Sequence, residues 1–481
     1  NQIPIYFILQ ILLLTVSLKS NDAARILAYF PVPSISHHIV FRALTEELAR
    51  RGHEVTVITT DPAYPNGRTP ANLTEIDVHD MSYEEWRMQF KVNPAGGNDL
   101  VLPVRLVSQT VMKIVERQLN VDKVQKVLKG DKFDLLLLEA CVRPALLLSH
   151  VIKAPVIQVS SLGPFNMNVG IIGSAWHPLL YPDTLSKHAE NELGKRLFGP
   201  SVPPISELKN NVDMLLLNIH PIWEGNRPVP PSVIYMGGLH QKPDKELPVE
   251  LQTYLNSSKN GVIYISFGTN VQTALLPPER VQLMVKVFSQ LPYDVLWKWD
   301  IDELPGRSEN IRISKWLPQS DLLRHPKIKV FITQGGLQST DEAITAGVPL
   351  IGVPMATDQW YNVEKYTLIS FLKNELSFDK SIYTCFSYRD NIIKLGSIMR
   401  DQPQSPLERA VWWTEHVLRH GGARHLRAPA ANMSWAQYLE LELVLTLAVI
   451  ALAMILLLSL LLYKLWTYLR LHVEQNKLKV N

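Results

Sequence analysis

The stretch "FITQGGLQSTDEAITAGVPLIGVPMATDQWYN", residues 331–362, combines two short apolar runs with a polar, helix-forming segment between them. The first apolar run ends at Gln334, and Gly335 and Gly336 follow it directly. A helix that begins there points its first backbone N–H groups at the strand end, and glycine lets a phosphate come close. The stretch therefore predicts a β-α-β unit with an anion site at its strand end. For the glycine pair alone, an ordinary turn with a capping residue is the alternative.

Polar side chains extend this site in both directions along the stretch. The helix is expected to begin near Gln338, and Ser339 and Glu342 then share one helix face. The hydroxyl can bind phosphate oxygens, and the carboxylate can accept hydrogen bonds from a diol such as a ribose. Asp358 and Gln359, after the second apolar run, offer acceptors and donors for sugar hydroxyls.

A tryptophan lies upstream, in "WLPQSDLLRHP", residues 316–326. Pro318 fixes a turn that exposes Trp316, with Gln319 beside it. A flat indole next to an amide suits stacking and hydrogen bonding of a base. Base, ribose, diphosphate and sugar are thus each matched in one segment, which predicts a nucleotide-sugar site.

The rest of the chain predicts two α/β domains that face a cleft. The first series begins with "RILAYFPV", a helix with Ser36 as its N-cap, and "EVTVIT". Buried strands "FDLLLLEA" and "APVIQVSS" follow, whereas residues 65–130 are expected to be irregular apart from the helix "VRLVSQTVMKIVERQLN". A proline-rich linker, residues 226–250, precedes a second series that starts at "GVIYISFGT". We place the two domains at residues 22–240 and 241–440, with ligands at the carboxyl ends of the strands.

The segment from Trp316 to Asn362 resembles the signature of the UDP-glycosyltransferases, W-x-P-Q followed by H-G-G-x-x-S-x-x-E and D-Q. The resemblance covers nearly the whole chain, and "TQGGLQSTDEAI" is most similar to insect members. The family implies a GT-B fold of two Rossmann-like domains and inverting transfer without a metal or another cofactor. The N-terminal domain would bind the acceptor, and the C-terminal domain the UDP-sugar.

The resemblance also implies roles for single residues of the donor site. Trp316 would stack on uracil beside Gln319, Glu342 would hold the ribose, and Asp358 with Gln359 would hold the sugar. Gln334 stands where many members have a histidine, and its amide can donate but offers no charge. The complete expected donor site is Thr269 of "SFGT", Trp316, Gln319, Gln334, Gly335, Gly336, Ser339, Glu342, Asp358 and Gln359.

For the catalytic base, the family keeps a histidine at the helix start after the first strand, here "SISHH". We assign His37, with His38 as the lesser candidate; a neutral base is expected because a helix N-terminus disfavours imidazolium. The family has an aspartate after its "FD-apolar" strand to orient the base, and here Glu139 takes that position. The alternatives are a histidine that merely neighbours a cap and an exposed acid at a strand end.

The two ends of the chain predict a membrane protein. Residues 1–21 read as a secretory signal sequence. Residues 441–463 contain an uninterrupted apolar run long enough to cross a bilayer, and Lys464 and Arg470 follow it, which predicts a cytosolic tail at 464–481. The final "KLKVN" resembles a retrieval signal of the endoplasmic reticulum, which favours a single-pass protein with luminal catalytic domains.

Further features support or limit this interpretation. Asn72, Asn256 and Asn432 are acceptor sites for N-glycosylation in such a lumen. The net charge of +3 gives no reason to expect nucleic acid, and a homo-oligomer is left open. The two cysteines, Cys141 and Cys385, are expected to be small buried hydrophobes.

The expected activity is the transfer of a hexose, preferably glucose from UDP-glucose, to a hydroxyl of a small lipophilic acceptor. Detoxification and the conjugation of hormones or pigments are reactions of this kind. A UDP-glucuronosyltransferase is one alternative. The other is a binding relative with impaired catalysis, because residues 367–386 depart from the family and are shorter than expected.

Overall fold

The structure is a computed structural model that describes residues 23–64, 67–92, 101–164, 168, 187–226, 228–269, 273, 276–355, 358–370 and 385–478. The expected signal sequence lies outside these residues, as does most of the atypical segment 367–386. Two compact units are present, Asn1–Arg427 and Ala428–Asn481, and each is described by itself.

The first sheet has seven strands, all parallel, in the order β3-β2-β1-β4-β5-β6-β7. Chain order reverses between β1 and β4, so the loop after β1 and the end of β4 meet at one edge. The strands β4, β5 and β6 are buried along their whole length, as expected of a parallel sheet covered on both faces. Their bounds are β1 (Arg25–Phe30), β2 (Glu54–Thr59), β3 (Leu73–Asp77), β4 (Leu135–Glu139), β5 (Val156–Ser160), β6 (Val212–Leu217) and β7 (Val233–Tyr235).

The second sheet has five parallel strands in the order β10-β9-β8-β11-β12, so its chain order reverses between β8 and β11. The winding is the same as in the first sheet, and the predicted pair of Rossmann-like domains is confirmed. Its strands are β8 (Val262–Ser266), β9 (Asp294–Lys298), β10 (Ile311–Ser314), β11 (Ile328–Thr333) and β12 (Leu350–Gly352).

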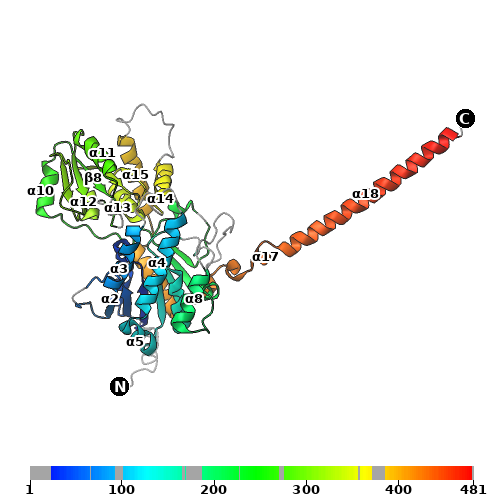
Figure 1. The fold of residues 1–481 in the computed structure, drawn as a ribbon, viewed down its shortest axis with the longest axis horizontal. Coiled ribbons are helices and arrows are strands. Elements are labelled where there is room, and N and C mark those ends of the chain that lie inside the picture. The colour runs from blue at the N-terminus through cyan, green and yellow to red at the C-terminus, as the bar shows by residue number, and fades with distance from the viewer. Residues whose placement is uncertain are drawn as a thin grey trace, which may run out of the picture. The chain divides into compact units, whose positions relative to one another are not determined.

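Helices cover both sheets (Figure 1). Those that follow strands of the first sheet are α2 (Ile35–Arg50), α3 (His79–Val92), α4 (Val101–Leu119), α5 (Asp122–Gly130), α6 (Leu148–Val151), α8 (Lys187–Phe198) and α9 (Ile205–Leu208). Those of the second half are α10 (Val249–Ser257), α11 (Pro278–Ser289), α12 (Gln319–Leu323), α13 (Leu337–Ala346), α14 (Gln359–Ser370), α15 (Cys385–Arg400) and α16 (Pro406–His420).

The structure corrects two local predictions. Ser34, not Ser36, is the N-cap of α2: its backbone is extended, and its carbonyl accepts from the N–H groups of His37 and His38. Residues 67–130 are also more regular than expected where the structure describes them, with strand β3 and helices α3, α4 and α5. Helix α5 forms because Val124 and Leu128, four residues apart, bury one face of a short polar helix.

Helix α16 follows the second domain in sequence but packs against the first. Its Val411 and Val417 share a core cluster with Leu44 of α2. Arg51, just after α2, pairs with Glu415 at 3.2 Å. The sequence placed this helix with residues 241–440, whereas its apolar face packs against α2 of the first sheet's half.

The second unit contains α17 (Trp435–Tyr438) and α18 (Leu441–Leu478). In the described part of the chain, α18 is the one helix long and apolar enough to cross a membrane, over Leu441–Val473. The apolar helix predicted at 441–463 is thus present and continues beyond that range.

Candidate active site

His37 and Glu139 come together at the edge where the first sheet reverses its chain order. His37 lies in the first turn of α2, after β1, and Glu139 is the last residue of β4. His37 Nδ1 is 2.7 Å from Glu139 Oε1, while the side chains are 14% and 1% exposed. The alternative of an exposed strand-end acid is therefore wrong: Glu139 is buried and faces the imidazole.

Two further groups hold the Glu139 carboxylate. The backbone N–H of Val32 donates to Oε2 at 3.1 Å, and the Cys141 thiol donates to Oε1 at 3.3 Å. Burial, with the nearby carboxylate, raises the pKa of this thiol well above its usual range, which keeps it protonated. Because a carboxylate only accepts, His37 donates through Nδ1, and in the neutral ring Nε2 then keeps its lone pair. Cys141 is thus more than the small hydrophobe expected from sequence.

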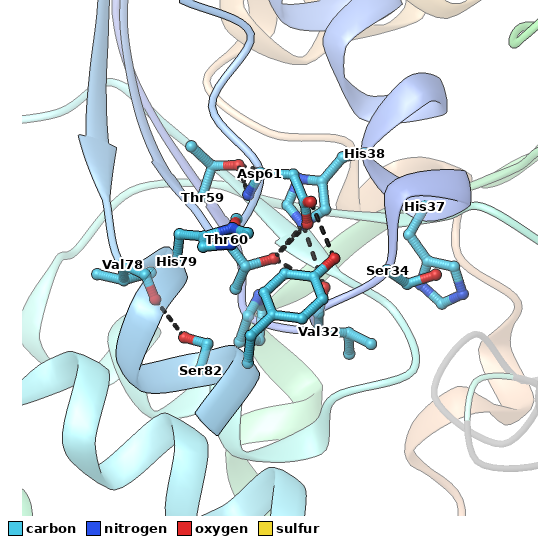
Figure 2. Close-up of polar contacts among 12 residues, drawn as sticks. Val32, Ser34, His37, His38, Thr59, Thr60, Asp61, Val78, His79 and Ser82 are labelled. Carbon is cyan, nitrogen blue, oxygen red and sulfur yellow. Dashed lines mark hydrogen bonds and ion pairs between the residues drawn. The ribbon is translucent and has the colours of Figure 1, made fainter. Parts of the chain in front are cut away.

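His38 points away from this pair into a buried polar cluster. Its Nδ1 lies 2.9 Å from Thr59 Oγ1, and its Nε2 lies 3.1 Å from the Val32 carbonyl and 2.8 Å from Thr60 Oγ1. Figure 2 shows these groups converging on His38, whereas His37 lies apart from them beside Ser34. Burial lowers the pKa of His38 to about 4, so the ring is neutral. His38 therefore fixes the carbonyl of the same Val32 whose N–H donates to Glu139.

Glycines and an amide occupy the corresponding edge of the second sheet. Gly336 is the N-cap of α13, and Gly335 has a φ of +86°. A side chain at 335 would place its Cβ 2.5 Å from Val363 Cγ2, so both space and backbone demand glycine. The buried Gln334 amide lies against Gly268, where an added Cβ would be 2.3 Å from Nε2. The side chain of Gln334, after β11, therefore packs directly against the backbone of Gly268, after β8.

Three predicted donor-site residues form one hydrogen-bond network. Gln319 Nε2 donates to Ser339 Oγ at 2.9 Å and to Glu342 Oε2 at 2.8 Å. Its Oε1 accepts from the Tyr264 hydroxyl at 3.0 Å. Desolvation raises the pKa of Glu342. The expectation that Ser339 and Glu342 share a face is confirmed, and Gln319 joins them from α12.

Trp316 and Thr269 are exposed at the same edge. The Trp316 side chain is 60% exposed after β10, and Thr269 follows Gly268 after β8. Lys298, the last residue of β9, lies between them: its Nζ donates to the Gly268 carbonyl at 2.6 Å and is 5.9 Å from the Trp316 ring. Burial lowers the pKa of Lys298. Lys298 is not among the donor-site residues expected from the sequence, although a lysine that ends the apolar strand "VLWK" is a usable signal.

Asp358 and Gln359 lie at the start of α14, as expected from the sequence. Asn362, one turn later, donates from Nδ2 to Asp358 Oδ2 at 2.7 Å and to the Gly335 carbonyl at 3.0 Å. Gln359 Oε1 accepts from the Met355 N–H at 2.9 Å. Asn362 thus connects the acid to the glycine turn, and its place one turn after Asp358 was the signal that we overlooked.

Side-chain contacts join the two edges. Gln338 Nε2, in the first turn of α13, donates to the Ser36 carbonyl in the first turn of α2 at 2.6 Å. Gln241, after the linker, donates to Asp341 Oδ2 at 2.7 Å. Ser36 precedes His37, and Gln338 precedes Ser339. The edge of the first sheet that carries His37 (the imidazole edge) therefore adjoins the edge of the second sheet that carries Gly335 and Gly336 (the glycine edge).

Comparison with known proteins now identifies the family. The model of the family "UDP-glucoronosyl and UDP-glucosyl transferase" matches residues 202–475. The chain belongs to this family. It is therefore a glycosyltransferase that uses a UDP-sugar, and the resemblance seen in its sequence is confirmed.

Relatives of this glycosyltransferase are similar over nearly their whole length. An ecdysteroid UDP-glucosyltransferase of Spodoptera littoralis nuclear polyhedrosis virus is 34% identical over 91% of this chain and 97% of its own. UDP-glucosyltransferase 2 of Dactylopius coccus is 33% identical over 90% of this chain and 91% of its own.

Solved structures agree on the fold of the glycosyltransferase. Arabidopsis thaliana UGT89C1 complexed with UDP-L-rhamnose has a TM-score of 0.58 at 14% identity, covering 83% of this chain and all of that one. A Polygonum tinctorium UDP-glucosyltransferase, described as capable of glucosylating indoxyl, has a TM-score of 0.56 at 15% identity, with 83% of this chain and 100% of that chain covered. Both support the GT-B architecture.

Proposed function

We propose that this glycosyltransferase moves glucose from UDP-glucose to a hydroxyl of a small lipophilic acceptor, with His37 as the base. The observation that carries the proposal is the 2.7 Å contact between His37 and the buried Glu139, placed beside the donor edge by the contact of Gln338 with Ser36. Relatives named UDP-glucosyltransferases support glucose. Those named for ecdysteroids support a lipophilic, hydroxylated acceptor. Attaching a sugar to such a molecule makes it more soluble in water, which is the use of this chemistry in detoxification and in hormone or pigment conjugation.

In the proposed reaction, His37 Nε2 accepts the proton of the acceptor hydroxyl. The hydroxyl oxygen attacks the anomeric carbon from the face opposite UDP, a new C–O bond forms, and the bond to the diphosphate breaks. The charge left on the imidazolium faces Glu139, whose carboxylate the Val32 N–H and the Cys141 thiol hold in place. The resulting sugar linkage is inverted.

In the proposed donor complex, uracil stacks on Trp316 and the ribose hydroxyls bind Glu342. The phosphates bind the backbone N–H groups at the start of α13, together with Ser339 and Thr269. Lys298 provides the positive charge that Gln334 lacks. The sugar hydroxyls bind Asp358 and Gln359.

We infer glucose as the preferred sugar because no lysine or arginine stands within six residues of Asp358 in the sequence to pair with a second carboxylate. The nearest cation along the chain, Lys365, has its Nζ 5.2 Å from the centroid of the Tyr361 ring. A buried unpaired carboxylate costs several kcal/mol. We therefore expect UDP-glucose to be preferred over UDP-glucuronate by at least ~100-fold in kcat/KM, about 2.7 kcal/mol.

The test is a competition between the two donors with one phenolic acceptor, read by product mass. Glucuronide in excess, or equal incorporation, would show that a basic side chain reaches the sugar from elsewhere. A protein that binds UDP but gives neither product would be the impaired relative that the segment 367–386 suggested. A panel of phenols and steroids, assayed with the preferred donor, would then define the acceptor class.

We further propose that α18 spans the membrane of the endoplasmic reticulum and that the catalytic domains are luminal. Asn72 and Asn256 are exposed, as glycan acceptors must be. Deleting residues 443–481 should give a soluble, glycosylated product, sensitive to a glycosidase. An unglycosylated product in the cytosol would show that this topology is wrong.

A further inference from the structure

Three potential metal ligands meet at the imidazole edge of the first sheet. The ligand atoms of His37, Glu139 and Cys141 all lie within 4.8 Å of one another. Within the described ranges, no other group of three histidine, cysteine, aspartate or glutamate side chains meets this criterion. The set combines an imidazole nitrogen, a carboxylate oxygen and a thiol sulfur, the three ligand types that Zn²⁺ uses in proteins.

The spacing of these atoms is close to what a tetrahedral ion requires. Bonds of about 2.0–2.3 Å place neighbouring ligand atoms roughly 3.3–3.7 Å apart. The Cys141 sulfur is already 3.3 Å from Glu139 Oε1. His37 Nδ1, at 2.7 Å from the same oxygen, has to withdraw by less than an ångström. The dyad is thus nearly preformed for an ion, and water or a substrate hydroxyl would fill the fourth position.

We propose that a thiophilic divalent cation, Zn²⁺ or Cd²⁺, binds His37 Nδ1, Glu139 and Cys141 and inhibits sugar transfer reversibly. Inhibition, but not binding, rests on the proposed role of His37 as the base. The ion carries two positive charges, and a thiolate and a carboxylate carry two negative ones, so the buried complex is neutral. The ion replaces the hydrogen bonds that Glu139 now accepts from the imidazole and the thiol.

Metal binding inhibits transfer because it changes where the protons of Cys141 and His37 lie. The Cys141 thiol loses its proton to solvent when it becomes a ligand, which the ion makes favourable despite burial. His37 must free Nδ1 for the ion, so its single proton moves to Nε2 and the ring stays neutral. Net release is one proton for each ion bound. Nε2 then carries hydrogen and has no lone pair to accept the proton of an acceptor hydroxyl.

A second group of histidines could also bind the added metal ions and therefore has to be mutated before the measurements. The rings of His416, His420 and His425 have centroids 4.5–6.4 Å apart and could bind metal ions without touching the dyad. All measurements therefore use the full chain with His420→Ala and His425→Ala, in detergent and without a polyhistidine tag. This variant is called the background protein below.

Binding is tested with Cd²⁺ alone, through the ultraviolet charge-transfer band of a cadmium–thiolate bond. The background protein should bind one ion with this band and release one proton. Adding Cys141→Ser should abolish the band, whereas Cys385→Ser, the change of the other cysteine, should leave it intact. A band that persists in the Cys141 variant, or disappears in the Cys385 variant, would overturn the site. Cys141→Ala gives the same decision if the serine variant does not fold.

Inhibition is tested with Zn²⁺, with each variant's rate expressed relative to its own metal-free rate. The Zn²⁺ concentration for half-inhibition should rise at least about 10-fold in the Cys141 variant and stay unchanged in the Cys385 variant, since loss of even an outer partner of a metal site weakens binding by this much. A cadmium band without zinc inhibition would mean that the ion leaves the base free, which contradicts the inference and the role of His37 together. Absence of the band would contradict only the metal site.

Discussion

The two sheets wind in the same order, and yet the edges at which they reverse carry opposite chemistry. At the first edge, between β1 and β4, a buried carboxylate faces an imidazole. At the second, between β8 and β11, two glycines, the buried Gln334 amide and the N-terminus of α13 lie together with Lys298 nearby. The first edge suits proton transfer, and the second suits an anion.

The residues that follow each strand account for this difference. At the first edge, α2 begins at a serine in extended conformation, so His37 in its first turn can face the end of β4. At the second, α13 begins directly after Gly335 and Gly336, and neither residue has a side chain of its own to keep an anion from the N–H groups. One topology thus provides two positions, and local sequence decides what each position does.

The largest effect is expected for His37→Ala. Loss of the base should lower kcat by roughly 10²- to 10⁴-fold, because general base catalysis contributes that much. Affinity for UDP should change by no more than a few-fold, since the proposed nucleotide site lies at the other edge. Turnover assays and calorimetry with UDP separate the two. An active His37→Ala protein with an inactive His38→Gln protein would reverse our assignment of the base.

His38 should affect stability in a pH-dependent way. Its pKa is about 4 when folded and close to the ordinary 6.5 when unfolded. Between these values the unfolded chain binds a proton that the folded chain does not, so the free energy of unfolding falls as pH drops from 6.5 to 4. The total contribution is about 3 kcal/mol, fully present above pH 6.5.

This dependence is measured by comparing urea unfolding of the wild type and of His38→Gln at several pH values. The variant should be less stable at neutral pH and should lose less stability on acidification. Equal losses in the two proteins would show that another group causes the acid sensitivity.

The sequence was sufficient to predict features that are set by the position of a residue at the end of a strand. Each domain's winding, the pairing of His37 with Glu139 and the shared face of Ser339 and Glu342 follow from where residues stand relative to apolar runs. It predicted poorly what depends on contacts distant in sequence. The Cys141 thiol on Glu139 and the return of α16 to α2 require knowledge of which surfaces meet, and no local pattern encodes that.

A smaller effect on the other edge is expected for Trp316→Ala. Removing a stacked base partner should weaken UDP binding by roughly 1–3 kcal/mol, about 5- to 150-fold in Kd. The rate at saturating donor should change much less. This is the opposite of His37→Ala, which should lower kcat and leave the affinity for UDP nearly unchanged. Calorimetry with UDP measures this directly. An unchanged Kd would remove Trp316 from the nucleotide site, and a lost kcat with intact binding would contradict the separation of the two edges.

The smallest effect concerns the contact that joins the edges. Gln338 donates to the carbonyl of Ser36, directly before His37, while its own neighbour Ser339 accepts a hydrogen bond from Gln319 in the proposed donor site. Gln338→Ala removes this hydrogen bond, which should cost about 0.5–1.5 kcal/mol, roughly 2- to 12-fold in kcat/KM. UDP affinity should be unchanged, because no donor group is lost.

Gln241→Ala is the matched control: it removes an amide contact with Asp341 on the same helix but does not reach the first turn of α2. If both variants lower kcat/KM equally, general attachment of α13 to the first domain matters more than the alignment of Ser36 with Gln338. If only Gln338→Ala does, the two edges work as one site because this single bond sets their register.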